Sequence, residues 1–122
     1  MTLMILMALA GLMGASGIVL AATSAHAAPG AGLDSAAYML LFHAVAVLGG
    51  VALVQQSVLW RPLMVFVLAA WVLGAALFSG DVAFRAFTGY RLIPMAAQTG
   101  GIILIVAWIG LAAAAIGTLV RS

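Results

Sequence analysis

Four long runs of apolar residues limit what this chain can fold into. Each run is close to the roughly 20 residues that an α-helix needs to cross the ~30 Å hydrocarbon core of a bilayer. None of the runs alternates between apolar and polar residues, as the strands of a membrane barrel do. The sequence therefore predicts an all-α membrane protein, a four-transmembrane-helix bundle with short loops. The runs cover 1–22, 36–54, 63–80 and 101–120.

The composition agrees with burial in lipid. Hydrophobic residues make up 68% of the 122 positions and charged residues only 5%, which is too little polar surface to cover a water-soluble protein. The chain has no cysteine and a net charge of only +2, so neither thiol chemistry nor nucleic-acid binding is indicated. We expect a single integral membrane domain over 1–122, with helices at about 1–23, 35–55, 62–88 and 96–120.

The segment SAHAAPG, residues 24–30, is similar to the cleavage site of a secretory signal peptide. No Lys or Arg precedes it, however, and the apolar stretch before it is longer than such a peptide has. We therefore expect the first predicted helix to be retained and this segment to connect it to the second. Asp34 or Ser35 is expected to cap the second helix, and Pro62 is expected at the first position of the third.

The few polar side chains are expected to gather at one end of the bundle. Asp81 follows Pro62 by 19 residues, a rise of roughly 28 Å along a helix, which brings it to the end where the first two helices are connected. Asp81 and Arg85 have the i, i+4 spacing of an ion pair. This pair is either an intrahelical lock or a polar gate that contacts a substrate. The candidate functional polar residues are His26, His43, Asp81, Arg85, Arg91 and Thr99.

His43 differs from the other candidates because it lies inside a predicted span, where a neutral imidazole needs a hydrogen-bond partner. A Ser, a backbone carbonyl or Tyr38 could fix it as a packing residue, and a functional role is the alternative. A haem held by His26 and His43 is disfavoured because the two lie at different depths. The methionines of the first helix lack thiol or acidic partners, so we expect no cofactor and no metal.

Small residues recur at four-residue spacing in every predicted helix, which allows helix backbones to approach closely in lipid. Close packing of all four helices would leave little room for an aqueous pore. Arg85 and Arg91 could also contact the phosphates of lipid headgroups. The predicted helix-packing residues are Gly14, Gly50, Gly74 and Gly110.

Several segments together resemble a small bacterial membrane family, domain of unknown function 423, to which eukaryotic transmembrane protein 256 is related. These segments are AATSAH, FHAVAVLGG, LFSGDVAFRAFTG and TGGIILIVAWIGL. The most specific piece is LFSG with its spacing to TGG and Trp108. The resemblance implies four membrane helices, an uncleaved first helix and a location in the bacterial inner membrane. It also marks motif positions without assigning them roles: His26, His43, Ser79, Gly80, Thr99, Gly100 and Gly101.

The chain departs from the family pattern at two of the positions that matter here. Asp81 stands where a small neutral residue is expected, and Gln98 replaces a proline. The ion pair of Asp81 with Arg85 is therefore not implied by the resemblance.

Two functions remain open on the sequence. The first is a non-catalytic protein that packs against other membrane chains in the lipid bilayer, as an accessory subunit of a larger complex or as a self-associating bundle. The alternative is a small transporter or proton-linked carrier that uses His43 and the polar cluster around Asp81 and Arg85. We do not expect an enzyme, because the sequence has no Ser–His, Cys–His, paired-carboxylate or HExxH arrangement at a credible depth.

Overall fold

A computed structural model describes residues 1–122 as four α-helices without strands. Each helix is long and apolar enough to cross a membrane, so the predicted all-α, four-transmembrane-helix class is confirmed. The helices are α1 (Thr2–His26), α2 (Leu33–Gln55), α3 (Arg61–Thr88) and α4 (Ala96–Arg121).

The helix ends differ from the predicted ones by up to three residues. α1 continues to His26, so the first three residues of SAHAAPG are helical. The predicted side-chain cap of α2 is wrong, because α2 begins at Leu33 after Gly32, which has a φ of +79° and no side chain, and no other side chain caps this end. Ser35 instead donates from its hydroxyl to the Gly32 carbonyl over 3.1 Å. Pro62 is the second residue of α3, where its missing N–H is still not needed.

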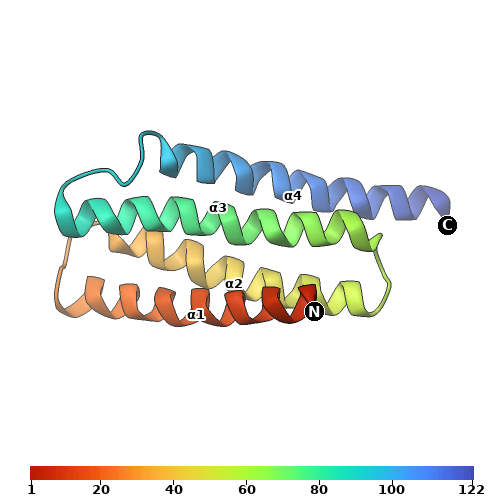
Figure 1. Ribbon diagram of the computed structural model, residues 1–122, viewed down its shortest axis with the longest axis horizontal. Helices are drawn as coiled ribbons and strands as arrows, with labels where there is room; N and C mark the ends of the chain where they lie inside the picture. The colour runs from red at the N-terminus through yellow and green to blue at the C-terminus, as the bar shows by residue number, and fades with distance from the viewer.

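The four helices do not form a closed quartet. α1, α2 and α3 pack on one another, whereas the backbone of α4 approaches only α3, and Figure 1 shows α4 along the outer side of α3. About 44% of the α2 span and 39% of the α3 span are buried, against 22% for α1 and 17% for α4. The expectation that all four helices pack closely is therefore met best by α2 and α3, whereas α1 and α4 are mostly exposed.

Helix α3 packs against α2 and against α4 by different means. Toward α2, Trp71 and Leu68 are almost fully buried, and the Ser79 hydroxyl donates to the Ala36 carbonyl over 2.9 Å. Toward α4, the contact is between backbones. A Cβ built on Gly100 would lie 2.6 Å from both the Gly74 carbonyl oxygen and the Phe78 nitrogen. Two glycines thus set how closely α3 and α4 approach.

The predicted packing glycines all lie near a neighbouring helix, but Gly100 was not among them. A Cβ on Gly14 would lie 3.9 Å from the Ala44 Cβ. A Cβ on Gly110 would lie 3.2 Å from a methyl of Val67, and one on Gly50 would overlap the Leu68 side chain. Ala96 precedes Gly100 by four positions and is also buried, so the small-residue spacing is present, but both residues lie before the apolar run at 101–120 in which the packing residues were expected.

We expect Gly100→Ala to destabilise the protein by about 1 to 3 kcal/mol, because the added methyl group collides with the α3 backbone, which cannot move aside as a side chain can. Gly101→Ala is the matched control, since a Cβ at Gly101 meets nothing within 4 Å. Denaturant unfolding of both variants in detergent micelles measures the difference. Equal unfolding free energies for the two variants would contradict this contact.

Candidate functional site

His43 is bonded through both ring nitrogens although it lies within the span of α2 and is only 3% exposed. Its Nδ1 lies 2.9 Å from the Met39 carbonyl oxygen, and its Nε2 lies 3.2 Å from Nε1 of Trp108. An indole N–H can only donate, so Nε2 accepts and Nδ1 donates, which is the pattern of a neutral imidazole. The bond joins α2 to α4, whose backbones do not touch.

Aromatic rings surround this hydrogen bond. The ring centroids of Trp71 and Trp108 are 4.4 Å apart, and those of Phe42 and Trp108 are 5.8 Å apart. Trp71 is almost completely buried, and its Nε1 has no hydrogen-bond partner. His43 Nε2 therefore has one indole donor, from Trp108, while the second indole of the cluster is unpaired.

The backbone carbonyl was one of the partners expected for His43, but Trp108 was not. Comparing how far His43 and Trp108 lie along their helices could have identified Trp108 as the partner. Both α2 and α4 begin at the same end of the bundle, and His43 and Trp108 follow those starts by 10 and 12 residues, which places them about 15 and 18 Å along their helices. An indole N–H at the same depth as an imidazole is the signal, but it requires knowing that the two helices are near each other.

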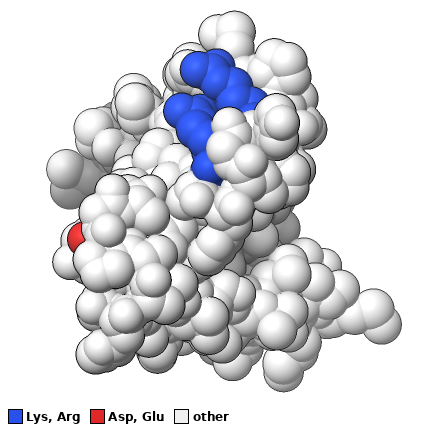
Figure 2. Space-filling model, turned by 90° about the vertical axis from the view of Figure 1, so that its left-hand side faces the viewer, with Lys and Arg blue, Asp and Glu red and all other residues white.

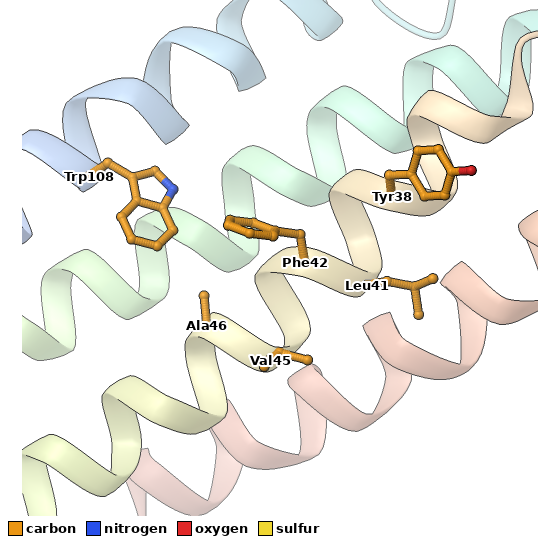
Figure 3. Close-up of a pocket in the computed structure, with 6 residues that line it drawn as sticks. All are labelled: Tyr38, Leu41, Phe42, Val45, Ala46 and Trp108. Atoms are coloured by element: carbon orange, nitrogen blue, oxygen red, sulfur yellow. The ribbon is translucent and has the colours of Figure 1, made fainter.

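A shallow apolar groove lies between α2 and α4, beside the bond between His43 and Trp108. Its volume is about 620 Å³. Figure 3 shows Phe42 and Trp108 pointing toward each other from the two helices, with Tyr38 farther along α2. The lining residues of this α2–α4 groove include Tyr38, Met39 and Phe42 from α2, with Ile105 and Trp108 from α4. An adjoining pocket of about 590 Å³, drawn in Figure 3, shares Tyr38, Phe42 and Trp108 with the groove and extends along α2 to Ala46.

Asp81 forms the predicted ion pair and a second bond that the sequence did not suggest. Its Oδ2 lies 3.2 Å from an Arg85 guanidinium nitrogen, and its Oδ1 accepts the N–H of Leu92 over 3.0 Å. Asp81 is 1% exposed, whereas the Arg85 side chain is 43% exposed. The carboxylate therefore fastens the connection between α3 and α4, residues 89–95, to the last turns of α3.

The remaining candidates, His26, Arg91 and Thr99, are exposed and make no side-chain hydrogen bond within the chain. They lie at the same end as Asp81 and Arg85, because α1 and α3 end there and α4 begins there. Figure 2 views this end and shows the basic side chains in one patch, apart from an acidic atom at the side. No group of three or more His, Asp or Glu side chains is brought together.

These features define a small multi-pass membrane protein with few polar side chains, of which the buried His43, Ser79 and Asp81 are bonded within the chain. The family described as "Protein of unknown function (DUF423)" matches residues 13–101, which is more than half of the sequence. The chain belongs to this family, as its resemblance indicated. The matched region includes His43 and the Asp81–Arg85 pair, while Trp108 lies beyond it. No curated protein and no solved structure matches the chain.

Trp108→Phe is expected to cost about 1 to 3 kcal/mol of stability, because it removes the donor to His43 Nε2 and leaves a buried acceptor unpaired. Trp60→Phe makes the same chemical change at a residue that is 64% exposed and has no side-chain hydrogen bond, so it should have little effect. Thermal unfolding in micelles compares the two. If both variants lose the same stability, the hydrogen bond contributes nothing.

Asp81→Ala is expected to release the connection between α3 and α4, because it removes the acceptor for the Leu92 N–H together with the ion pair. Limited trypsin digestion reports this directly, since Arg91 lies in that connection. Arg85→Gln removes only the ion pair and should accelerate cleavage after Arg91 much less. Cleavage at the wild-type rate in Asp81→Ala would show that the carboxylate does not hold this segment.

Proposed function

We propose that this chain is a non-catalytic packing subunit of the bacterial inner membrane, which associates through α4 with other membrane chains or with a second copy of itself. The observation that carries the proposal is an exposed row of residues along α4. Their spacing alternates between four and three positions, the heptad pattern of helices that pack against each other. The row, here the α4 seam, consists of Ile102, Val106, Ile109, Ala113, Ile116 and Val120.

The α4 seam lies on the side of α4 that faces away from α3. The residues of α4 that are buried against α3 include Leu104, Ala107 and Ala114, which are on the opposite side of the helix at 100° per residue. The seam is uniformly exposed, with Ile109 at 63%. A helix that has one neighbour in its own chain thus presents a second complete packing face.

The composition of the α4 seam suits a helix partner. Five of its six positions are Ile or Val, whose side chains have few rotamers in a helix and so lose little entropy when they are packed. Membrane helices associate through such van der Waals contact, with crossing angles similar to those of coiled coils. Lipid would also cover this face, so the distinction between a helix partner and lipid rests on the experiment that follows.

The buried polar groups support a non-catalytic role. The two nitrogens of His43 and the two oxygens of Asp81 are each bonded within the chain. A carrier that used His43 and the cluster around Asp81 and Arg85 would first have to break these bonds. That alternative is therefore less well supported than packing.

Photo-crosslinking in native membranes tests the proposal. A benzophenone amino acid at position 109 should give one discrete adduct, with another protein or at twice the 12.4 kDa mass of this chain. The matched control is position 66 on α3, because Phe66 is 71% exposed but lies outside the seam. Replacing Ile102 and Ile116 by Ala should reduce the adduct at position 109 severalfold.

The opposite results are equally clear. Lipid adducts alone at position 109, or the same protein adducts at positions 109 and 66, would mean that the α4 seam is an ordinary lipid-facing surface. The double Ala variant separates a specific contact from random collision, because random collision does not depend on seam residues seven positions away.

A further inference from the structure

A cleft between the start of α3 and the end of α4 is lined by an arginine that has no partner in the chain. Its volume is about 410 Å³. Trp60 and Leu63 line it from the start of α3, and residues between Ala113 and Arg121 line it from the end of α4. Figure 1 shows that α4 ends near the start of α3, away from the connection between these two helices. We call this surface the α3–α4 cleft.

The α3–α4 cleft changes from apolar to cationic along its length. Leu63 and Ala113 line its inner part, whereas Trp60 and Arg121 lie nearer the end of the bundle. Ala113 precedes Arg121 by eight residues, a rise of about 12 Å along the helix. Gly117 leaves room between them, because a Cβ there would meet nothing within 4 Å. A phospholipid has the same order, with acyl chains toward the membrane centre and a phosphate at the interface.

The unpaired polar side chains of the cleft can only donate hydrogen bonds. Arg121 is exposed and unpaired, since the one ion pair in the chain lies at the other end of the bundle. The indole N–H of Trp60 is also without a partner, while the Thr118 hydroxyl already donates to the Ala114 carbonyl over 3.0 Å. A guanidinium and an indole N–H are both complementary to the oxygens of a phosphodiester.

The end of the bundle that holds this cleft has no acidic side chain. The two acids of the chain are Asp34, in the first turn of α2, and Asp81, in the last turns of α3, and both lie at the opposite end. Arg61 adds a second cation near the cleft, in a separate pocket that shares only Trp60 with it. A headgroup ammonium would therefore find no carboxylate here, whereas a phosphate would meet arginines only.

We propose that the α3–α4 cleft binds an anionic phospholipid. Its phosphate accepts from Arg121 and from the Trp60 indole N–H, and the upper part of an acyl chain lies against Leu63 and Ala113. The favoured headgroup has a phosphodiester without an ammonium group, as in phosphatidylglycerol. Phosphatidylcholine has the same phosphate, but also an ammonium that nothing in the cleft matches. The cleft shares only Ala113 with the α4 seam, so this lipid site does not depend on the packing proposal.

Native mass spectrometry of the full chain from detergent micelles tests the site. The protein is titrated with phosphatidylglycerol or phosphatidylcholine of identical acyl chains, and the apparent dissociation constant of the first bound lipid is measured. We expect the wild-type chain to bind the glycerol lipid about fivefold more tightly, the effect of one arginine on an anionic lipid. Arg121→Gln should remove most of this preference.

Two matched pairs of variants separate the cleft from a general attraction between charges. Arg61→Gln removes the same charge at the same end of the bundle but outside the cleft, so most of the preference should remain. Gly117→Leu keeps both arginines and fills the cleft, so it should weaken binding of the glycerol lipid severalfold. Its control is Gly49→Leu, at an exposed glycine of α2 whose Cβ would also meet nothing within 4 Å.

Three results would overturn the proposal. Equal affinities of the wild-type chain for the two lipids would mean that the cleft does not select a headgroup. Equal losses of preference in Arg61→Gln and Arg121→Gln would mean that the lipid responds to the whole cationic end. Unchanged binding in Gly117→Leu would mean that the lipid lies elsewhere. None of these measurements involves adducts at position 109, so failure of the lipid site is distinguishable from failure of the packing proposal.

Discussion

The backbone contact between Gly74 and Gly100 determines much of what is specific to this structure. Lipid offers no hydrophobic drive for helices to associate, so close approach depends on van der Waals contact between small residues. At this crossing a single methyl group would collide with the opposing backbone. The contact holds α4 against α3 alone, and the placement of Trp108, the α2–α4 groove and the α4 seam all follow from it.

Most of the polar groups that this fold buries are bonded inside the chain. His43 bonds to the Met39 carbonyl and to Trp108, Ser79 to the Ala36 carbonyl, and Asp81 to Arg85 and Leu92. These bonds have a positional role, since each joins a helix to another helix, to its own preceding turn or to a connection. Trp71 is the exception, because its buried N–H has no partner. It lies beside the one hydrogen bond that joins α2 to α4.

Helix α4 has three different sides. One side is buried on α3, a second lines the groove with its His43 contact, and the third carries the heptad spacing. The proposed association with another helix therefore uses the side of α4 that faces neither α3 nor His43.

Features that depend on length and local spacing can be predicted from the sequence alone. Four apolar runs fixed the number and class of the helices, because a bilayer of given thickness requires a given helix length. The i, i+4 spacing of Asp81 and Arg85 placed both on one helical face. Recognition of the family added no role for any residue.

The remaining features depend on which helix lies beside which, and only the packed structure shows this. Three contacts join residues that no periodic pattern relates: Trp108 with His43, the Gly100 backbone with the Gly74 backbone, and the Leu92 N–H with Asp81. The exposure of the α4 seam likewise depends on which helices are adjacent, and no spacing within α4 predicts it. Small residues occur in every helix, so their spacing shows that backbones can approach closely, while only the packed structure shows which of them do.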